Sequence, residues 1–466
     1  MQLTKLTSLL LGAGLLVACG DNGGNGDDGP GPDAAPPKFA TNSCSKLMAA
    51  RCMEIASGDA GALATAANSI EADTTIVLDA GTYPMTNQLT FRTKGVHLVG
   101  QGIDKTTLDF GDVIAQSNGV DVIGDDFLIQ DLTVLDAKKD GIRVEQSSGV
   151  VFRRIRATWT TPSLSSNGAY GIYPVKSQNV LVEDSRAENA SDAGLYVGQC
   201  QHVIVRNNIV RGNVAGLEIE NTQYADVYGN TAEDNTGGIV VFDLPGNPIV
   251  GRDVRIRDNM IKNNNHENFA SGGTVASIPV GTGTFAMASR RVEITGNTYE
   301  KNDTVDISII SGLAIESTPA SWVLDTATLQ GKFDDLGLEP AGADKVMNFR
   351  SENIVVANNK HSGSGTKADI EDPLMLGLLL RLGYGADPVD NVLYDAIEET
   401  FEPATPLYTN NHHICVGGNT NGTFGSLALD RQSAANQVPF YRPAKPFAPF
   451  DCTALEGGPV APVVLP

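Results

Sequence analysis

Residues 194–242 read GLYVGQCQHVIVRNNIVRGNVAGLEIENTQYADVYGNTAEDNTGGIVVF, and this stretch shows the repeat on which the fold depends. A glycine that precedes a leucine or isoleucine recurs every 22 positions, at Gly194, Gly216 and Gly238. Asn213 and Asn235 repeat with the same spacing. Such a period, with two or three short strands per unit, indicates a solenoid, in which each unit buries its apolar face only by stacking on its neighbours.

The repeat continues on both sides of this stretch. Eight expected short strands end in a four-residue segment that begins with an apolar residue and continues with mostly polar ones. The last residues of these segments are Leu132, Ile155, Ser185, Asn208, Asn230, Asn259, Asn297 and Asn359. Successive members lie 23, 30, 23, 22, 29, 38 and 62 positions apart, so the unit is 22–23 residues and the longer gaps hold insertions. A second asparagine follows at Asn189, Asn213, Asn235, Asn264 and Asn302. Because asparagine tolerates the backbone of sharp corners, we expect these residues to stack into internal ladders.

The repeat predicts an all-β chain folded as a single-stranded right-handed parallel β-helix of roughly ten coils. A leucine-rich horseshoe, the rival repeat fold, needs a regular Leu-x-x-Leu-x-Leu frame that is missing here. We expect the β-helix to span residues 71–365. The ends of such a stack are open sheet edges that must be covered. We therefore expect a helical cap at residues 40–70, and an insert, a disulfide loop and a proline-rich tail within residues 366–466.

Two segments interrupt the repeat near the C-terminus. Residues 320–350 and 367–400 lack the glycine and asparagine spacing. Residues 374–380 and 392–399 are expected to be helical inserts, because their apolar residues do not alternate as in a strand.

The first residues are typical of an export signal. A basic start precedes an apolar run that is too short for a permanent membrane helix. The run ends in Leu16-Val17-Ala18-Cys19-Gly20, which looks like a bacterial lipobox. We expect a signal peptide at residues 1–18, a lipid anchor on Cys19 and a flexible acidic linker at residues 19–39. These features predict a lipoprotein of the cell envelope, and Gly20 after the cysteine favours the outer membrane over the inner one. The alternative is a plain signal peptide in which the cysteine is incidental.

Five cysteines remain in the exported part. Cys44 pairs most simply with Cys52, and Cys415 with Cys452, so that one disulfide staples each end of the chain. Cys200 is left over and is expected to be buried as a small apolar residue. The sequence has no Cys-x-x-Cys, so a zinc ribbon and a thioredoxin-like site are unsupported.

The formal net charge is −22. This charge argues against nucleic acid as a partner, because binding to phosphates requires a basic surface. It also argues against unassisted binding of polyanionic sugars or anionic lipid headgroups.

Several phrases of the repeat resemble a known family. The phrases are residues 167–175 (NGAYGIYPV), 191–199 (SDAGLYVGQ), 216–221 (GLEIEN) and 242–246 (FDLPG). They are similar to the bacterial parallel beta-helix domain-containing lipoproteins, within the NosD and pectate-lyase-like solenoid group. The resemblance implies the β-helix fold, and relatives in the wider group bind, cleave or epimerise polysaccharides. It also implies a protein partner in the envelope, a neighbouring cytochrome-like lipoprotein.

Strand alternation places a chemically rich set of side chains on one outer face. In each repeat, the recurring glycine is followed by an inward-facing leucine or isoleucine, and the next residue faces outward. These outward-facing residues form one column, Arg143, Tyr173, Tyr196, Glu218 and Val240. The residues two positions further form a second column, Glu145, Val175, Gly198, Glu220 and Phe242. Insertions at residues 160–169, 244–253 and 265–283 are expected to wall this face into a groove. Aromatic rings beside carboxylates suit sugars, so we expect a polysaccharide or oligosaccharide as the partner.

The two columns suggest roles for individual residues. Glu218 and Glu220 stand about 7 Å apart on one strand, which suits paired carboxylates of a glycoside hydrolase. The candidate catalytic residues are Glu218, Glu220, Asp192 and Tyr196, and the candidate substrate-binding residues are Arg143, Tyr173, Phe242 and Asp243. A polysaccharide lyase would instead pair Arg143 with a tyrosine base. Asp192 and Asp243 are candidates for a Ca2+ site, although aspartates at strand ends more often cap turns.

Two hypotheses therefore stand. The first is a cell-envelope lipoprotein whose groove binds, and as an enzyme cleaves, a carbohydrate polymer. The second is a non-catalytic structural or adaptor lipoprotein that docks a protein partner on the same face, its Glu and Tyr residues being ordinary solvated strand residues. His412 and His413 beside Cys415 belong either to a metal site or, as we favour, to a surface loop closed by the disulfide.

Overall fold

The structure is a computed structural model that describes residues 38–373, 375–397, 410–429, 443–445 and 447–466. The expected signal peptide, the lipid anchor at Cys19 and residues 19–37 of the linker lie outside these residues. So do Leu374 and residues 398–399 of the two expected helical inserts.

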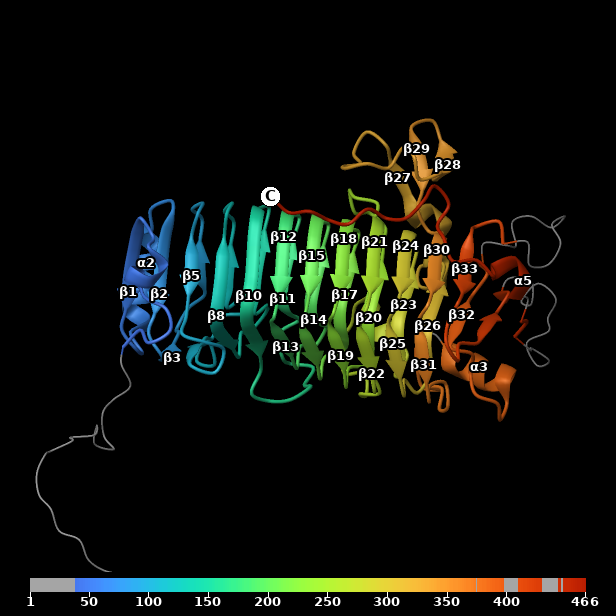
Figure 1. Ribbon diagram of the computed structural model, residues 1–466, viewed down its shortest axis with the longest axis horizontal. Helices are drawn as coiled ribbons and strands as arrows, with labels where there is room; N and C mark the ends of the chain where they lie inside the picture. Colours follow the sequence, from blue (N-terminus) through green and yellow to red (C-terminus); the bar gives the residue numbers. More distant parts are fainter. Residues whose placement is uncertain (1–37, 374, 398–409, 430–442, 446) are drawn as a thin grey trace, which may run out of the picture. The chain divides into compact units, whose positions relative to one another are not determined.

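Most of the chain forms two parallel sheets, which we call sheet A and sheet B. Each rung of the chain adds a strand to both sheets, and Figure 1 shows the strands of successive rungs side by side. The eleven strands of sheet B are β4 (Leu89–Phe91), β7 (Val120–Val122), β9 (Ile142–Glu145), β11 (Tyr170–Val175), β14 (Ala193–Gly198), β17 (Ala215–Glu220), β20 (Gly237–Phe242), β23 (Thr282–Met287), β26 (Val305–Ile310), β32 (Val392–Tyr394) and β34 (Phe424–Ser426). The chain is therefore a parallel β-helix, and the predicted all-β class is confirmed.

Sheet A has twenty strands and folds around the corner of each rung. Its first column consists of β1 (Arg51–Ile55), β2 (Thr74–Leu78), β5 (His97–Val99), β8 (Leu128–Leu135), β10 (Ser148–Thr158), β12 (Gln178–Glu183), β15 (Gln201–Arg206), β18 (Gln223–Tyr228), β21 (Arg252–Arg257), β24 (Arg290–Thr295), β30 (Glu352–Ala357) and β33 (Ile414–Gly417). Its second column consists of β3 (Gly81–Pro84), β6 (Thr106–Asp109), β13 (Arg186–Glu188), β16 (Ile209–Arg211), β19 (Thr231–Glu233), β22 (Met260–Lys262), β25 (Thr298–Glu300) and β31 (Lys360–Ser362).

The remaining elements are short. A small antiparallel sheet lies in the segment that breaks the repeat, and it consists of β27 (Val323–Asp325), β28 (Glu339–Gly342) and β29 (Lys345–Met347) (Figure 1). The helices are α1 (Cys44–Leu47), α2 (Ala60–Ser69), α3 (Leu376–Tyr384), α5 (Phe447–Phe450) and the single turns η1 (Thr274–Ser277), η2 (Gly312–Ala314) and η3 (Pro319–Trp322). Within the described ranges, no helix has both the length and the apolar character that a bilayer crossing requires.

Alternating side chains build the core inside the rungs. Leu195, Leu217 and Ile239 stand in register on β14, β17 and β20, and all three are fully buried. Stacking equivalent apolar residues at the strand spacing of about 4.8 Å gives one continuous core. The core therefore follows from the same two-residue alternation that the sequence displays.

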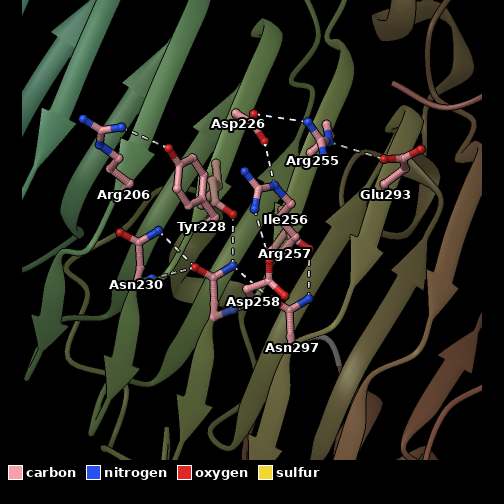
Figure 2. Close-up of polar contacts among 12 residues, drawn as sticks. Arg206, Asp226, Tyr228, Asn230, Arg255, Ile256, Arg257, Asp258, Glu293 and Asn297 are labelled. Atoms are coloured by element: carbon pink, nitrogen blue, oxygen red, sulfur yellow. Dashed lines mark hydrogen bonds and ion pairs between the residues drawn. The ribbon is translucent and has the colours of Figure 1, made fainter. Parts of the chain in front are cut away.

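Two ladders of asparagines hold the corners, and all members except the partly exposed Asn419 are buried. The first runs through Asn208, Asn230, Asn259, Asn297, Asn359 and Asn419, each Nδ2 donating to the next Oδ1 at 3.0–3.1 Å. The second runs through Asn213, Asn235, Asn264 and Asn302. Figure 2 shows Asn230 and Asn297 of the first ladder beneath the outer face of sheet A. Asn189 stands outside both ladders, because its side chain donates to the Trp159 carbonyl oxygen instead.

The outer face of sheet A carries a network of paired charges (Figure 2). Asp226 accepts from Arg255 and Arg257, each at 3.2 Å. The Arg257 guanidinium lies 4.0 Å from the ring centroid of Tyr228, whose hydroxyl accepts from Arg206. Arg255 and Arg257 are therefore neutralised within the protein.

The N-terminal end is covered as expected, with one addition. Helix α2 packs Leu63 and Ala67 over the first rung. Between the two cap helices, β1 pairs in parallel with β2, so the first rung of sheet A begins inside the segment expected to be only a cap. The disulfide Cys44–Cys52 joins α1 to β1.

The C-terminal end differs from the prediction. Strands β32, β33 and β34 add rungs beyond residue 365, so the expected end of the β-helix is too early. Residues 392–394 are a strand and not a helix, because Val392 and Tyr394 fill the inner core next to the β26 rung. The helix expected from residue 374 is present as α3. The disulfide Cys415–Cys452 joins β33 to the tail, and Cys200 is free and buried.

Candidate functional site

The strand register brings the two predicted columns together. Tyr173 stands beside Arg143, and Tyr196 beside Glu218, which is itself followed by Val240. In the second column Gly198 stands beside Glu220, and Glu220 beside Phe242. All of these residues lie on the outer side of sheet B, opposite the core.

This face is not the open groove that we expected. Glu218, Glu220, Tyr196, Phe242 and Asp243 are all buried. A second apolar cluster covers the outer side of sheet B, built from strand residues and from the insertions, and its members include Tyr196, Val240, Phe242, Val275, Ile278, Phe285, Met287, Trp322 and Phe349. The prediction that Glu218, Glu220, Tyr196 and Phe242 line an open groove is therefore wrong, because the insertions pack onto the face instead of standing beside it. Asp243, which we expected to bind substrate, is also buried.

Three tyrosine rings meet where this cover ends. The ring centroids of Tyr170, Tyr173 and Tyr196 lie 4.6–4.9 Å apart in all three pairings. Tyr170 and Tyr173 are partly exposed, whereas Tyr196 is buried. The rings therefore form a partly open aromatic surface at the edge of the covered region.

Carboxyl groups surround these rings. Tyr170 lies close enough to Asp192, and Tyr196 to Glu220, for each hydroxyl to lower the pKa of its neighbouring carboxyl group. Glu218 is the residue of β17 that stands in register with Tyr196 of β14. We call Tyr170, Tyr173, Tyr196, Asp192, Glu218 and Glu220 the tyrosine–carboxylate cluster.

Gly198 makes room for the contact between Tyr196 and Glu220. A Cβ at position 198 would lie 2.3 Å from Cε1 of the Tyr196 ring and 2.4 Å from its hydroxyl oxygen. The ring thus lies across the backbone of Gly198, and its hydroxyl reaches the Glu220 side chain on the next strand. Asn247, on the loop after β20, donates to Glu220 Oε1 at 3.0 Å from the other side.

The carboxyl groups of the cluster hold their protons unusually well. Burial, opposed by the hydrogen bond from Tyr170, raises the pKa of Asp192 to about 7. Burial and the nearby Asp192 and Glu220 carboxyls raise the pKa of Glu218 well above its ordinary value. Burial also raises the pKa of Glu220, while the hydrogen bonds from Tyr196 and Asn247 act in the opposite direction.

The three carboxyl-bearing residues of the cluster differ in how much of each is exposed to solvent. Asp192 is partly exposed, Glu220 is 7% exposed and Glu218 only 1%. Glu218 Oε1 has no hydrogen-bond partner in the described part of the chain. Asp192 is therefore the most accessible of the three carboxyl groups.

The other expected binding residues are less available. Arg143 is ion-paired with Asp121 at 3.4 Å and with Glu145. Asp243 Oδ2 accepts from the Gly251 backbone at 2.8 Å and from Asn348 at 2.6 Å, and burial raises its pKa to about 7. Of the four residues expected to bind substrate, only Tyr173 combines exposure with membership of the cluster.

Comparison with known proteins agrees with this architecture. The family model described as "Right handed beta helix region" matches residues 95–252 and 162–320. This chain is a right-handed parallel β-helix protein. The predicted handedness and the membership of the β-helix group are thereby confirmed. No curated protein matches its sequence.

Solved structures with the same kind of fold are distant. The β-helix protein shares 16% identity with the A-module of the mannuronan C-5 epimerase AlgE4 of Azotobacter vinelandii, over 75% of this chain and 93% of that one, with a TM-score of 0.43. It shares 16% identity with the pectate lyase Pel9A, over 56% of this chain and 76% of that one, with a TM-score of 0.35. The Dettilon tailspike protein matches at 12% identity over 70% and 66% of the two chains, with a TM-score of 0.41. Such distant similarities say nothing about what the β-helix protein acts on.

The expected Ca2+ site does not fit the β-helix protein. Among the residues described, the group of side chains that converge closely enough to hold a metal ion is His413, Cys415 and Cys452, and both cysteines are in the disulfide. The Asp243 carboxylate is already engaged by Gly251 and Asn348.

Sequence reasoning missed Tyr170 and Asn247. Tyr170 is three residues from Tyr173, so simple alternation places the two on opposite faces, yet their rings touch. The strand position before the recurring glycine faces outward on successive rungs, since Ala193 and Ala215, which stand in register with Tyr170, also belong to the outer apolar cluster. Asn247 carries no signal in the repeat, since it belongs to an insertion.

Proposed function

We propose that this β-helix protein binds a carbohydrate polymer at the tyrosine–carboxylate cluster and cleaves it by acid–base hydrolysis. The observation that carries the proposal is the meeting of three tyrosine rings with a partly exposed carboxyl group, Asp192, whose pKa lies at about 7. The rings offer an apolar face for a sugar, and the carboxyl groups bond to its hydroxyls.

The geometry suggests a division of roles. Asp192 still holds its proton near neutral pH, so it serves as general acid and gives that proton to the glycosidic oxygen as the C–O bond breaks. Glu220 accepts a hydrogen bond from Asn247, and Asn247 and Tyr196 both oppose the rise of its pKa, so it serves as the base that takes a proton from the attacking water. Glu218 is too deeply buried to touch substrate, and burial with the Asp192 and Glu220 carboxyls raises its pKa, so it stays protonated beside Tyr196 as a positioning residue. Asp192 itself is kept protonated by burial and by the Glu220 and Asp140 carboxyls.

Hydrolysis is favoured over elimination. A lyase needs a cation to neutralise a uronate and a base to remove a proton from carbon. Burial and neighbouring acids raise the pKa of Tyr173 and Tyr196, so that neither is a ready phenolate base. Arg143 is engaged by Asp121 and Glu145.

Docking of a protein partner on the same face is the weaker hypothesis. A docking surface requires flat, accessible rungs. The insertions cover the outer side of β17, β20 and β23 with apolar residues. We include in the proposal that the protein works at the cell envelope through a lipid on Cys19, supported by the sequence before that residue. Loss of radiolabelled palmitate incorporation in Cys19→Ser tests the anchor.

The test of the proposed function is a panel of neutral and acidic polysaccharides, with release of reducing ends as the readout. We expect release from at least one glycan, and a loss of about 100-fold or more in Asp192→Asn, because removal of a general acid costs about 10²–10⁴-fold. Tyr173→Ala is expected to raise KM. The control is Asp334→Asn, at an exposed position in the insertion. Wild-type activity in Asp192→Asn, or no activity and no binding on any glycan, would refute the proposal.

A further inference from the structure

A second polar surface lies around the corner from the tyrosine–carboxylate cluster. It is a cleft of about 360 Å³ between the ends of β9, β11 and β14, the starts of β12 and β15, and two insertions. Five glutamines line it, namely Gln146, Gln178, Gln199, Gln201 and Gln330. We call it the glutamine cleft.

The glutamines are arranged by the rungs. Gln146 and Gln199 occupy the corner after a strand of sheet B, each with positive φ, and Lys176 occupies the corner between them. Gln178 and Gln201 begin the next strands and are paired in register. The cleft is thus lined by two columns of polar side chains that repeat at the strand spacing of about 4.8 Å.

Most of these amides have no partner among the residues that the structure describes. The side chains of Gln146, Gln178, Gln199 and Gln330 make no hydrogen bond to any residue in the described ranges. Gln201 is the exception, since its Nε2 donates to Gln223 Oε1 at 3.1 Å. Each free primary amide offers two donors and one acceptor.

Two insertions close the cleft and fix its shape. Gln330 donates its backbone N–H to the Pro248 carbonyl oxygen at 2.7 Å, which ties the insertion before β28 to the loop after β20. Gly331 has φ +73°, and a Cβ there would lie 2.6 Å from Gln201 Nε2, so this insertion seats closely on the glutamines. The cleft is therefore preformed.

The cleft adjoins the cluster through a shared loop. Asn247 of that loop donates to Glu220, while the next two residues, Pro248 and Ile249, wall the cleft. Gln199 donates its backbone N–H to the carbonyl oxygen of Glu220 at 2.9 Å. A chain held in the cleft thus lies within reach of the cluster.

The charge of the cleft selects the ligand class. Its lining contains amides, one hydroxyl and Lys176, and it contains no carboxylate among the described residues. Lys176 is 3.5 Å from Glu145, so its charge is shared with a neighbouring acid. Among the described residues that line the cleft, no cation is free to pair with the carboxylates of a uronate polymer. The hydroxyls of a neutral sugar, in contrast, can both donate hydrogen bonds to amides and accept hydrogen bonds from them.

We infer that the glutamine cleft is a binding subsite for a neutral, extended polysaccharide, which it holds beside the tyrosine–carboxylate cluster. This inference rests on the proposed carbohydrate function and adds its substrate class. The repeat of amides along the rungs suits the repeat of hydroxyls along an extended glycan.

The test compares glycan binding by the protein and by Gln178→Ala/Gln199→Ala, using neutral oligosaccharides and oligouronates in isothermal titration. We expect neutral oligosaccharides to bind and oligouronates to fail. The double variant should bind about tenfold more weakly, as the loss of one or two hydrogen bonds implies. Gln116→Ala, at an exposed position outside the cleft, is the matched control and should bind as the wild type does.

The outcomes separate the two proposals. Cleavage of a glycan with unchanged affinity in the double variant overturns the cleft and leaves the proposed function standing. Weakened binding in the double variant, together with unchanged turnover in Asp192→Asn, supports the cleft and overturns the catalytic assignment. Preferential binding of oligouronates overturns the inferred substrate class, and binding of no glycan overturns both proposals.

Discussion

Replacement of Asp243 by asparagine should change how the stability of this protein depends on pH. Asp243 follows β20 and is 2% exposed. The hydrogen bonds that it accepts from Gly251 and from Asn348 both fall on Oδ2. An asparagine whose amide oxygen takes the place of Oδ2 keeps both bonds, so Asp243→Asn removes the titration and little else.

The magnitude follows from the pKa of this carboxyl group. Burial raises the pKa from 3.8 to about 7 in the folded protein. Between these values the folded state binds more protons at Asp243 than the unfolded state does, so the contribution of Asp243 to stability is largest below pH 3.8 and falls until the pH passes 7. Because a tenfold change in proton affinity corresponds to about 1.4 kcal/mol, the whole effect is about 4 kcal/mol, of which about 2 kcal/mol falls between about pH 5 and pH 7.

Urea unfolding of the wild type and Asp243→Asn at pH 5, 6 and 7 measures this difference. The stability of the variant relative to the wild type should rise by about 2 kcal/mol from about pH 5 to pH 7, because only the wild type must bury this acid. Asp334→Asn, at an exposed position, should show no such trend. A difference between wild type and Asp243→Asn that stays constant over this range would refute the reasoning.

Three further predictions concern the cluster and the ladders. Gly198→Ala should displace the Tyr196 ring and remove its bond to Glu220, reducing kcat about tenfold or more while leaving secondary structure by circular dichroism unchanged. Asn235→Ala should destabilise the protein by about 3 kcal/mol in urea unfolding, since it leaves buried ladder groups unpaired; a loss below about 1 kcal/mol would contradict this. The kcat/KM of the wild type should fall on the alkaline side near pH 7, where Asp192 loses its proton; a profile that stays flat through about pH 8 would contradict the assigned general acid.

The repeat predicted those parts of the protein that are local and periodic. Rungs of 22–23 residues fix which side chains become neighbours, so the register of Tyr196 with Glu218 and of Gly198 with Glu220 followed from spacing alone. The asparagine ladders followed for the same reason.

The depth of the candidate site did not follow from the repeat. Whether Glu218 meets water depends on where residues such as Val275, Trp322 and Phe349 come to rest, and these belong to insertions without a period. Tyr170 escaped prediction because strict alternation assigns its position to the inner face, whereas Ala193 and Ala215, in register with it, lie in the outer apolar cluster. The strand β32 was mistaken for a helix because Val392 and Tyr394 are recognisable as core only once the preceding rung is known.

Carbohydrate binding at the tyrosine–carboxylate cluster is best tested by a crystal structure of Asp192→Asn soaked with a neutral oligosaccharide. We predict a sugar ring against the face of Tyr173, its glycosidic oxygen within hydrogen-bonding distance of residue 192, and the rest of the glycan extending toward Gln199. A sugar bound on another face, with the tyrosine–carboxylate cluster unchanged at saturating ligand, would contradict the proposed site.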